Sequence, residues 1–361
     1  MNALDNVDRI KTPSEEVFVR DYVLTGTPVI LTDLFDRHPI RALDTLEAFR
    51  SAFGQVGVTA QGQYVNGMIN GVIDALEQVV QGKPVVPLPP PERREYSFAE
   101  YFDSVAQRPE ADLIVNQNET PEEVLRAAPI PELARRRSDS DYAISNVWLA
   151  NRGNVSSLHY DWDHTQVFYY QVFGRKRVII LRPEAAPLLN SLECFSAILP
   201  HQLSPPQRKA FLQYTDAYEV ILQPGETLFF PPLVWHHIEY VDTSMSINYR
   251  CNRNRYLHYL WGDNFHCDMY MQGLAAKMVD EQAARNQYGF VFNEIRDADH
   301  RPYPSLMAKY KAMKALFRDL YHRVHGERVG GDHFMPLLDA LSTILPGIYC
   351  MYERDPIAFQ V

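Results

Sequence analysis

The sequence predicts a mainly β protein, a double-sheet jelly roll with flanking helices and a C-terminal helical region. Between residues 143 and 252, short apolar or alternating runs recur at close spacing, separated by turn residues, which is typical of antiparallel strands. After residue 260 this pattern gives way to helical periodicity. We therefore expect two units: a jelly-roll domain with N-terminal α/β elements over residues 1–260, and a helical region over residues 261–361.

Residues 13–60 read as a helix, a strand, a second helix and a second strand. Ser14 followed by two glutamates is typical of a helix start, because a serine oxygen can accept a hydrogen bond from the first turn. Residues 27–32 are rich in β-branched side chains and predict a strand, whereas 43–53 have helical spacing. The proline-rich segment 83–91 predicts a stiff extended connector or lid.

The central part supplies the jelly roll. The predicted strands cover residues 144–150, 159–161, 166–173, 176–181, 218–222, 227–230, 235–241 and 244–249. Gly153, Gly174 and Gly225 interrupt these runs at positions suited to turns. A double sheet of this kind encloses an interior wide enough for a small ligand.

The C-terminal part predicts two helices, one ending near residue 326 and one over 334–344. The first carries an apolar stripe with spacings of 4, 3, 4, 3 and 4, made of Leu306, Tyr310, Met313, Phe317, Leu320 and Val324. Such a stripe packs either on the barrel or against a second copy of the chain. Both interpretations, including a homodimer through the C-terminal helices, are open at this point.

Composition excludes several classes of protein. The 361 residues are 46% hydrophobic and 22% charged, which suits a folded core, and the net charge of −10 disfavours a nucleic-acid partner. The four cysteines form no CxxC pair, which argues against zinc fingers and a secreted disulfide framework. The first residues lack a basic start with an apolar run, and no apolar stretch reaches 18 residues. We expect a cytoplasmic location and no membrane partner.

The tripeptide His159-Tyr-Asp161 is the first candidate for chemistry. Side chains at positions i and i+2 of a strand share a face about 6.6 Å apart, so His159 and Asp161 can converge on one metal ion. Asp163 lies about 13 Å from His159 along an extended strand and is the weaker carboxylate candidate. A similar tripeptide at His266 falls in the helical region, where positions i and i+2 point apart.

A third ligand is expected from the adjacent histidines His236 and His237, which face opposite sides of a strand. His236 shares its face with Ile238 and Tyr240. Because these neighbours are apolar, we expect His236 to face the interior. Two histidines and one carboxylate form a facial triad with three open positions, the arrangement of non-haem Fe(II) oxygenases. The open positions suit a bidentate 2-oxo acid and dioxygen.

A dicarboxylate held inside a barrel requires a cation for its far carboxylate. Lys176 follows the turn at Gly174 and alternates with Val178 and Ile180, so its ammonium is expected to point inward. Ser156, three residues before His159, is a candidate hydroxyl donor.

These residues resemble the JmjC or cupin-like family of Fe(II)- and 2-oxoglutarate-dependent oxygenases, most of all the subgroup of the asparaginyl hydroxylase of hypoxia-inducible factor. The resemblance covers about residues 8–252. Its strongest motifs are Gly153-Asn-Val-Ser-Ser-Leu-His-Tyr-Asp161, Phe168-Tyr-Tyr-Gln-Val-Phe-Gly-Arg-Lys176, Pro224-Gly-Glu-Thr-Leu-Phe-Phe-Pro231 and Trp235-His-His-Ile238.

The resemblance assigns roles to individual residues. It implies that His159, Asp161 and His236 bind Fe(II), which makes them the catalytic residues too. The residues implied to serve the 2-oxoglutarate co-substrate are Lys176, Ser156 and Asn248, the last as a polar group beside the metal. Candidates for contact with substrate are Tyr160, Trp162, Asp163, His164 and Trp148.

One departure from the family pattern concerns the co-substrate. Members of this subgroup often hold 2-oxoglutarate with a tyrosine from an earlier strand, but here Ile114 stands at the corresponding position. We expect Asn116 or Trp148 to compensate, and the sequence does not decide between them.

The predicted function is hydroxylation of a peptide or protein side chain, and the acidic chain suits a basic peptide. Alternatives are demethylation of N-methyl-lysine, oxidation of a small molecule or tRNA base, and a non-catalytic metal-binding cupin module.

Overall fold

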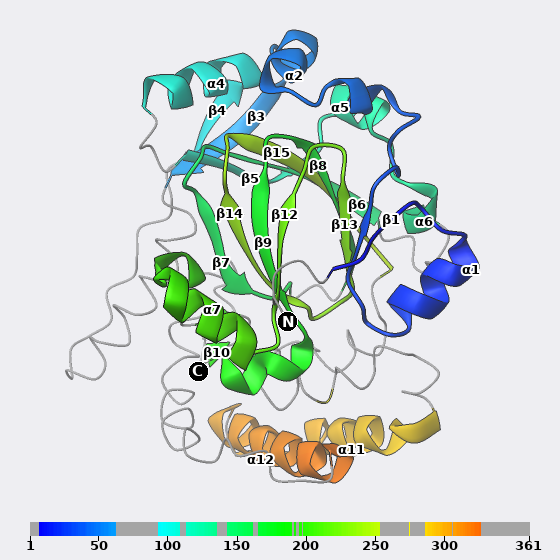
Figure 1. Cartoon of the computed structure of the whole chain (residues 1–361). Coiled ribbons are helices and arrows are strands. Elements are labelled where there is room, and N and C mark those ends of the chain that lie inside the picture. The colour runs from blue at the N-terminus through cyan, green and yellow to red at the C-terminus, as the bar shows by residue number, and fades with distance from the viewer. Residues whose placement is uncertain are drawn as a thin grey trace, which may run out of the picture.

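The computed structural model describes residues 7–62, 93–108, 113–135, 143–161, 165–189, 191–192, 195–196, 198–252, 274, 286–304 and 306–325. Within these ranges the chain forms a nine-stranded sheet and a six-stranded sheet, with helices around them (Figure 1). The predicted connector 83–91 and the predicted helix 334–344 lie outside the described residues.

Eight strands of the two sheets form the predicted jelly roll. The large sheet contains β6 (Ala143–Ala150), β8 (Gln166–Phe173), β13 (Thr227–Phe230) and β15 (Ser244–Cys251). The small sheet contains β7 (Val155–His159), β9 (Lys176–Leu181), β12 (Tyr218–Leu222) and β14 (Trp235–Tyr240). They are neighbours in the orders β13-β8-β15-β6 and β7-β14-β9-β12, and all these pairs are antiparallel. Most successive strands therefore cross from one sheet to the other, which closes the double sheet around an interior.

Further strands extend both sheets. On one side of the large sheet lie β2 (Val29–Leu31) and β1 (Arg9–Ile10), and on the other lie β5 (Leu113–Glu119), β3 (Gly57–Gly62) and β4 (Arg93–Ser97). The small sheet adds β11 (Phe195–Ser196) and β10 (Ser191–Leu192). Strand β3 corresponds to the second strand expected within residues 13–60, whereas β4 was not predicted, because its mixed polar residues lack a clear period of two.

N-terminal helices cover the outer face of the large sheet. They are α1 (Glu15–Phe18), which continues as the π-helix η1 (Val19–Val23), the 3-10 helix η2 (Pro39–Ala42), α2 (Leu46–Phe53), α4 (Phe98–Gln107), α5 (Glu122–Ala127) and α6 (Glu132–Arg135). The Ser14 cap is present, whereas α2 begins three residues later than predicted because Thr45 caps it, accepting from the Ala48 amide at 3.1 Å. Phe49 and Phe98 of these helices pack in one cluster with Phe173 of β8.

Alternation along β9 separates the interior of the barrel from its outer core. Val178 and Ile180 belong to the interior cluster, whereas Ile179 and Leu181 belong to the outer cluster of the small sheet. Gly174 precedes β9 with φ +67°, and a Cβ there would lie 2.8 Å from the Cα of Ser244. A glycine is therefore required at this turn, which sets the register of Lys176.

The predicted strand 159–161 is wrong in its bounds. Strand β7 covers Val155–His159, so His159 is its last residue and Asp161 lies on the chain that follows. The pairing of β7 with β14 shifts register between His236 and Ile238, a β-bulge that disturbs the simple alternation. Asp161 therefore reaches the histidine by a turn of the chain and not by sharing a strand face.

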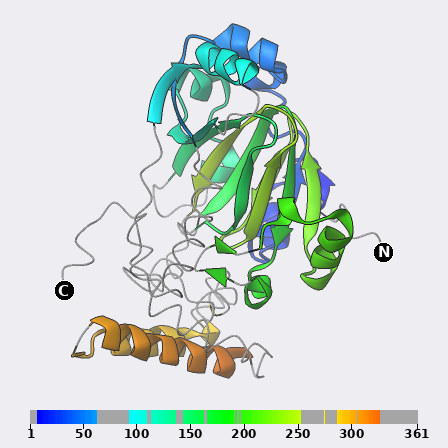
Figure 2. The same ribbon diagram turned by 90° about the vertical axis from the view of Figure 1, so that its left-hand side faces the viewer.

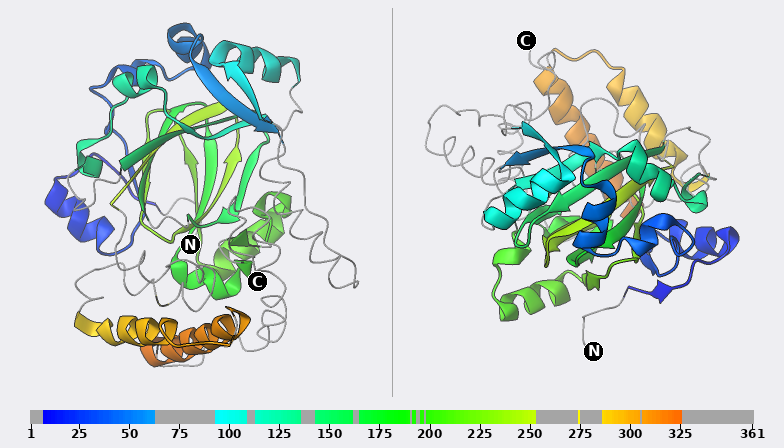
Figure 3. Two further views of the ribbon diagram at one scale, coloured as in Figure 1. Left: turned by 180° about the vertical axis from the view of Figure 1, so that it is seen from behind. Right: turned by 90° about the horizontal axis from the view of Figure 1, so that it is seen from above.

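The outer side of the small sheet carries 3-10 helices η3 (Pro183–Leu188) and η4 (Pro200–Gln202) and helix α7 (Pro205–Tyr214). Helices α11 (Gly289–Asp299) and α12 (Leu306–His325) lie at the end of the barrel away from α2 and α4 (Figures 2 and 3). Of the helices that the structure describes, none is both long and apolar enough to cross a bilayer.

Helix α12 buries the middle of its predicted stripe within a single chain. Met313, Phe317 and Leu320 are fully buried, in one hydrophobic cluster with Val291 of α11 and Leu181 of β9. This placement accounts for the stripe by packing within the chain. A homodimer through these helices stays a prediction, as does the boundary at residue 260.

Candidate metal centre

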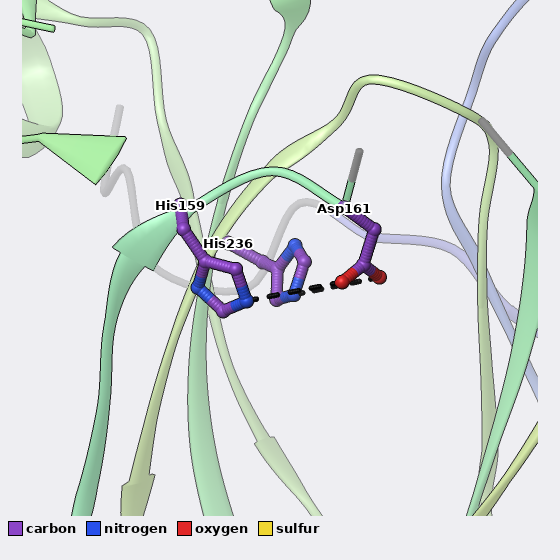
Figure 4. Close-up of side chains that lie close together, drawn as sticks. All are labelled: His159, Asp161 and His236. Carbon is purple, nitrogen blue, oxygen red and sulfur yellow. Dashed lines mark ion pairs between the residues drawn. The ribbon is translucent and has the colours of Figure 1, made fainter. Parts of the chain in front are cut away.

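Three predicted side chains meet at one end of the jelly roll. His159 ends β7, His236 lies on β14 directly opposite it, and Asp161 turns back toward both (Figure 4). The Nε2 atoms of His159 and His236 lie 3.9 and 4.0 Å from the two oxygens of Asp161, and one ligand atom of each residue lies within 4.8 Å of the others. These separations suit three ligands around a single ion.

Backbone carbonyls orient both imidazoles for metal binding. The Nδ1 of His159 lies 2.7 Å from the Ser157 carbonyl, and the Nδ1 of His236 lies 3.1 Å from the Val234 carbonyl. A carbonyl can only accept, so each Nδ1 carries the proton and donates it. Each Nε2 is then left with a free lone pair directed toward Asp161.

The charges of the three groups also suit a metal. Burial, followed by repulsion from His236, lowers the pKa of His159 to about 4. Burial likewise lowers the pKa of His236. For Asp161, burial acts to raise the pKa, but Arg250 and the two histidines outweigh it and hold the pKa well below its usual value. At neutral pH the site therefore offers two neutral imidazoles and one carboxylate.

This donor set fits Fe(II). Two imidazole nitrogens and one carboxylate are the ligands of the facial triad, and they leave three of six octahedral positions open. Within the described residues, this is the one group of three histidine, cysteine or acidic side chains close enough to share an ion.

Lys176 is buried in the interior with no acidic partner among the described residues. Its Nζ donates to the hydroxyls of Tyr169 and Ser246, each at 2.7 Å, and lies 4.3 Å from the centre of the Tyr240 ring. The side chain is fully buried, and burial lowers its pKa well below the usual value. Hydroxyls and an aromatic face stabilise a cation only in part, so this position suits an anionic ligand.

Lys176 and the metal centre share the same interior face of the small sheet. In the pairing of β9 with β14, Lys176 lies opposite Tyr240 and Ile180 lies opposite His236. We call these two positions along the barrel the level of Lys176 and the level of the metal centre. They are four residues apart on β9, which is about 13 Å along the strand axis. Apolar Val178 and Ile238 lie between them. The interior thus has a triad at one level and a cation at the other.

The large sheet faces this space with polar side chains of β15. Ser246, Asn248 and Arg250 alternate on one face, where Ser246 contacts Lys176 and Arg250 contacts Asp161. Asn248 therefore lies between the two levels, as its predicted role beside the metal requires. It is 4% exposed, and its Oδ1 has no hydrogen-bond partner among the described residues.

Ser156 occupies the small sheet near the same space. It is buried and lies opposite Ile238, whose face it shares across the paired strands. This position agrees with its predicted role as a hydroxyl donor toward a bound co-substrate, although that role stays a prediction.

The predicted substrate contacts divide into three groups. Tyr160 is 1% exposed and packs edge-on against Trp235 in the outer core, so its side chain does not line an open mouth. Trp148 lies opposite Ser246, and its buried Nε1 has no partner in the part of the chain that the structure describes. Trp162, Asp163 and His164 lie outside the described residues.

The structure shows which side chains contact Lys176, while the residue that compensates for Ile114 in holding 2-oxoglutarate stays a prediction. Ile114 lies in the apolar interior, and Lys176 contacts neither Asn116 nor Trp148 by a hydrogen bond in the described part of the chain. The hydroxyl that reaches Lys176 comes from Tyr169 of β8. Tyr169 lies inside the predicted strand 166–173, but the pattern of that strand does not indicate which side chain the Tyr169 hydroxyl contacts.

Two further residues at the site do not follow from the sequence alone. Ser246 and Arg250 both share the face of Asn248, so alternation from Asn248 is the one signal that could have found them. Conversely, His237 faces outward as predicted, where its ring stacks on His201 at 5.4 Å and its Nε2 lies 3.4 Å from Glu239.

Comparison with known proteins agrees with this geometry. A family model described as a cupin-like domain matches residues 14–252, which span the N-terminal elements and the whole jelly roll. The chain belongs to the cupin-like domain family. The match ends at Asn252, one residue after strand β15.

Several curated relatives of this cupin-like chain carry JmjC or demethylase names. JmjC domain-containing protein D of Dictyostelium discoideum is 35% identical over 107 residues, which are 28% of this chain and 23% of that protein. Lysine-specific demethylase 8 of Danio rerio is 27% identical over 265 residues, 69% of this chain and 59% of that protein. Lysine-specific demethylase JMJ30 of Arabidopsis thaliana is 26% identical over 246 residues, covering 65% and 52%. The chain thus spans less than two thirds of each relative.

Proposed function

We propose that this cupin-like protein is an Fe(II)- and 2-oxoglutarate-dependent oxygenase that hydroxylates a side chain of a peptide or protein. The observation that carries the proposal is the pairing of a ligand-ready triad with a buried lysine, inside one barrel, that has no acidic partner among the described residues. A metal site alone is compatible with a binding module. A buried cation at the second level of the same interior adds a place for the far end of a dianionic co-substrate.

Different residues of the chain would bind the metal and the co-substrate. His159, Asp161 and His236 would hold Fe(II), and Lys176 with the hydroxyls of Tyr169 and Ser246 would bind the far carboxylate of 2-oxoglutarate. When bound, the iron would supply the redox chemistry with dioxygen as the oxidant: one oxygen atom would go to the substrate C–H bond and the other to the 2-oxo acid, which is oxidised to succinate and CO2. The apolar walls between the two levels would exclude water and so strengthen the contacts to the carboxylate.

Demethylation of N-methyl-lysine is the second candidate, because two of the relatives are named lysine-specific demethylases. Hydroxylation of a substrate methyl group and hydroxylation of another carbon require the same metal and co-substrate, so the site supports both reactions. The particular likeness to the asparaginyl hydroxylase subgroup stays a prediction. A cytoplasmic location and a basic peptide substrate are likewise proposals, based on composition and on the net charge of −10.

The test is conversion of 2-oxoglutarate to succinate, measured with Fe(II) and dioxygen in the presence and absence of a peptide library. Substrate is then examined by mass spectrometry: a gain of one oxygen atom supports hydroxylation, and loss of a methyl group supports demethylation. His159→Ala and Asp161→Ala should abolish turnover. His201→Ala is the matched control, because His201 stacks on His237 outside the barrel interior.

The outcomes separate the functions. Turnover stimulated only by free metabolites or by tRNA would favour the small-molecule or tRNA-base oxygenase. Absence of any metal- and oxygen-dependent turnover would contradict the enzyme and favour a metal-binding module. Full turnover in both alanine variants would overturn the assignment of the triad.

A further inference from the structure

Arg250 connects the metal centre to the opposite sheet. It lies on β15, between β6 and β8 in the large sheet, and its Nη2 is 3.0 Å from Oδ2 of Asp161. The side chains are only 7% and 16% exposed, so solvent screens this ion pair little. The two histidines of the triad come from the small sheet. Two contacts thus join the large sheet to the triad: Phe230 of β13 stacks on His236 with ring centres 4.9 Å apart, and Arg250 forms the ion pair with the carboxylate of Asp161.

The position of Asp161 in the chain differs from that of the two histidines. The residue lies beyond the last residue of β7, outside the strand pairing that holds His159 opposite His236. Strand β15 in contrast pairs with β6 along all its residues and with β8 from Met245 to Cys251. A guanidinium on this paired strand can therefore hold the carboxylate of Asp161 in one orientation.

The two oxygens of Asp161 are consequently not equivalent. Oδ1 lies 3.9 Å from Nε2 of His159, whereas Oδ2 lies 4.0 Å from Nε2 of His236 and is hydrogen-bonded by Arg250. A carboxylate can bind a metal through one oxygen or through both. A charged donor on Oδ2 competes with a metal for the electrons of that oxygen.

We propose that Arg250 is a positioning residue that confines Asp161 to binding the metal through a single oxygen. This inference rests on the proposed function. A bidentate 2-oxo acid occupies two positions of an octahedral ion and dioxygen requires one, which together use all three positions that a facial triad leaves. A second oxygen of Asp161 on the metal would remove one of them. The ion pair therefore keeps the coordination sphere open.

The charge of Arg250 acts in the same direction. A positive group beside the site repels a metal cation and attracts an anionic co-substrate. Loss of Arg250 should therefore tighten metal binding, through lost repulsion and a second Asp161 oxygen, and weaken binding of the co-substrate. A residue that only supported the fold would weaken both. Opposite changes in the two affinities distinguish positioning from a structural role.

The experiment uses the whole chain loaded with Co(II), whose visible absorption reports coordination number. Wild type, Arg250→Met and Arg250→Lys are titrated with Co(II) and then with 2-oxoglutarate. We expect Arg250→Met to bind Co(II) at least as tightly as wild type, with an altered spectrum, and to bind 2-oxoglutarate at least 10-fold more weakly. Arg250→Lys keeps the charge and a donor, and should restore the spectrum toward wild type.

Lys176→Met is the matched control, since it removes a cation from the other level of the interior. It should weaken binding of 2-oxoglutarate and leave the Co(II) spectrum before that addition unchanged. An Arg250→Met protein with wild-type spectrum and wild-type affinity for 2-oxoglutarate would overturn the inference while the proposed function stands. Failure of wild type to bind Co(II) and 2-oxoglutarate would overturn both.

A measurement on wild type alone covers the case in which Arg250→Met does not fold. A crystal structure of the Co(II)-loaded protein should show one oxygen of Asp161 on the metal and the other on Arg250. Both oxygens on the metal would overturn the inference.

Discussion

The hydroxyl of Tyr169 on the large sheet lies 2.7 Å from the ammonium Nζ of Lys176 on the small sheet. This hydrogen bond crosses the interior of the jelly roll and joins its two walls. Ser246 forms a second such bond from β15. The end of the interior away from the triad is therefore lined by a cation and two hydroxyls, a set of donors suited to a carboxylate.

Replacing Lys176 by methionine should weaken binding of 2-oxoglutarate and leave the fold intact. A hydrogen bond to a charged group contributes about 1.5–3 kcal/mol, which corresponds to a loss in affinity of roughly 10- to 150-fold. Because the change removes a buried charge that has no acidic partner in the described part of the chain, we expect the free energy of unfolding to stay equal or rise. Titration calorimetry on the metal-loaded protein and urea unfolding measure the two effects. Unchanged affinity would contradict the assignment of Lys176.

Tyr169→Phe should weaken 2-oxoglutarate binding by a smaller factor. The change removes one hydroxyl beside the Lys176 ammonium but leaves the ammonium in place, so we expect a loss near the lower end of the range for a hydrogen bond to a charged group, about 1.5 kcal/mol or roughly 10-fold in affinity. Tyr170→Phe is the control, since Tyr170 is equally buried on the other face of the same strand, against Phe35. If both variants bind 2-oxoglutarate equally well, Tyr169 has no part in the pocket.

The stability of the metal-free protein should depend on pH through His159. The folded protein keeps this imidazole neutral down to its pKa of about 4, whereas in the unfolded chain it takes up a proton near 6.5. The contribution of His159 to the free energy of unfolding is therefore fully present above pH 6.5 and is lost as the pH falls from 6.5 toward 4. Urea unfolding across this range should show a shallower slope for His159→Ala than for wild type. Equal slopes would mean that the pKa of His159 is not lowered in the folded state.

Gly174→Ala should destabilise the protein more than Gly153→Ala does. Both glycines have positive φ, +67° and +88°, so an added side chain strains the backbone at either position by about 1–2 kcal/mol. At Gly153 a Cβ meets open space, whereas at Gly174 it collides with the backbone of Thr243 and Ser244. The difference between the two variants in the free energy of unfolding, measured with urea, gives the cost of the collision. Equal losses of stability would show that the turn before β9 can relax to avoid it.

Much of the jelly roll could be predicted because strand signals are local. The bounds of β8, β9, β12 and β13 agree with the predicted ranges, since their apolar runs are separated by turns at Gly174, between β8 and β9, and at Gly225, between β12 and β13. The predicted bounds of β7 were wrong: the strand covers Val155–His159, and its register shift against β14 depends on the partner strand and not on the local pattern. The small strands β10 and β11 have no local signal of this strength.

The choice of His236 over His237 shows how far local pattern reaches into the site. Opposite faces follow from the pleat, and apolar neighbours indicate which face is inward, so His236 could be assigned to the metal centre from its own strand. His237 accordingly lies on the outer side beside His201 and Glu239.

The sequence alone thus determined which side chains share a face on each strand, because that period of two is a property of the backbone. This periodicity was sufficient to place the two histidines of the triad on inward faces and to predict that Lys176 points inward. Only the tertiary structure decided which faces meet, because pairing across the interior depends on strand register and on how two sheets close. Tyr169 beside Lys176 and Arg250 beside Asp161 are contacts of this kind, and no signal along the chain connects either pair.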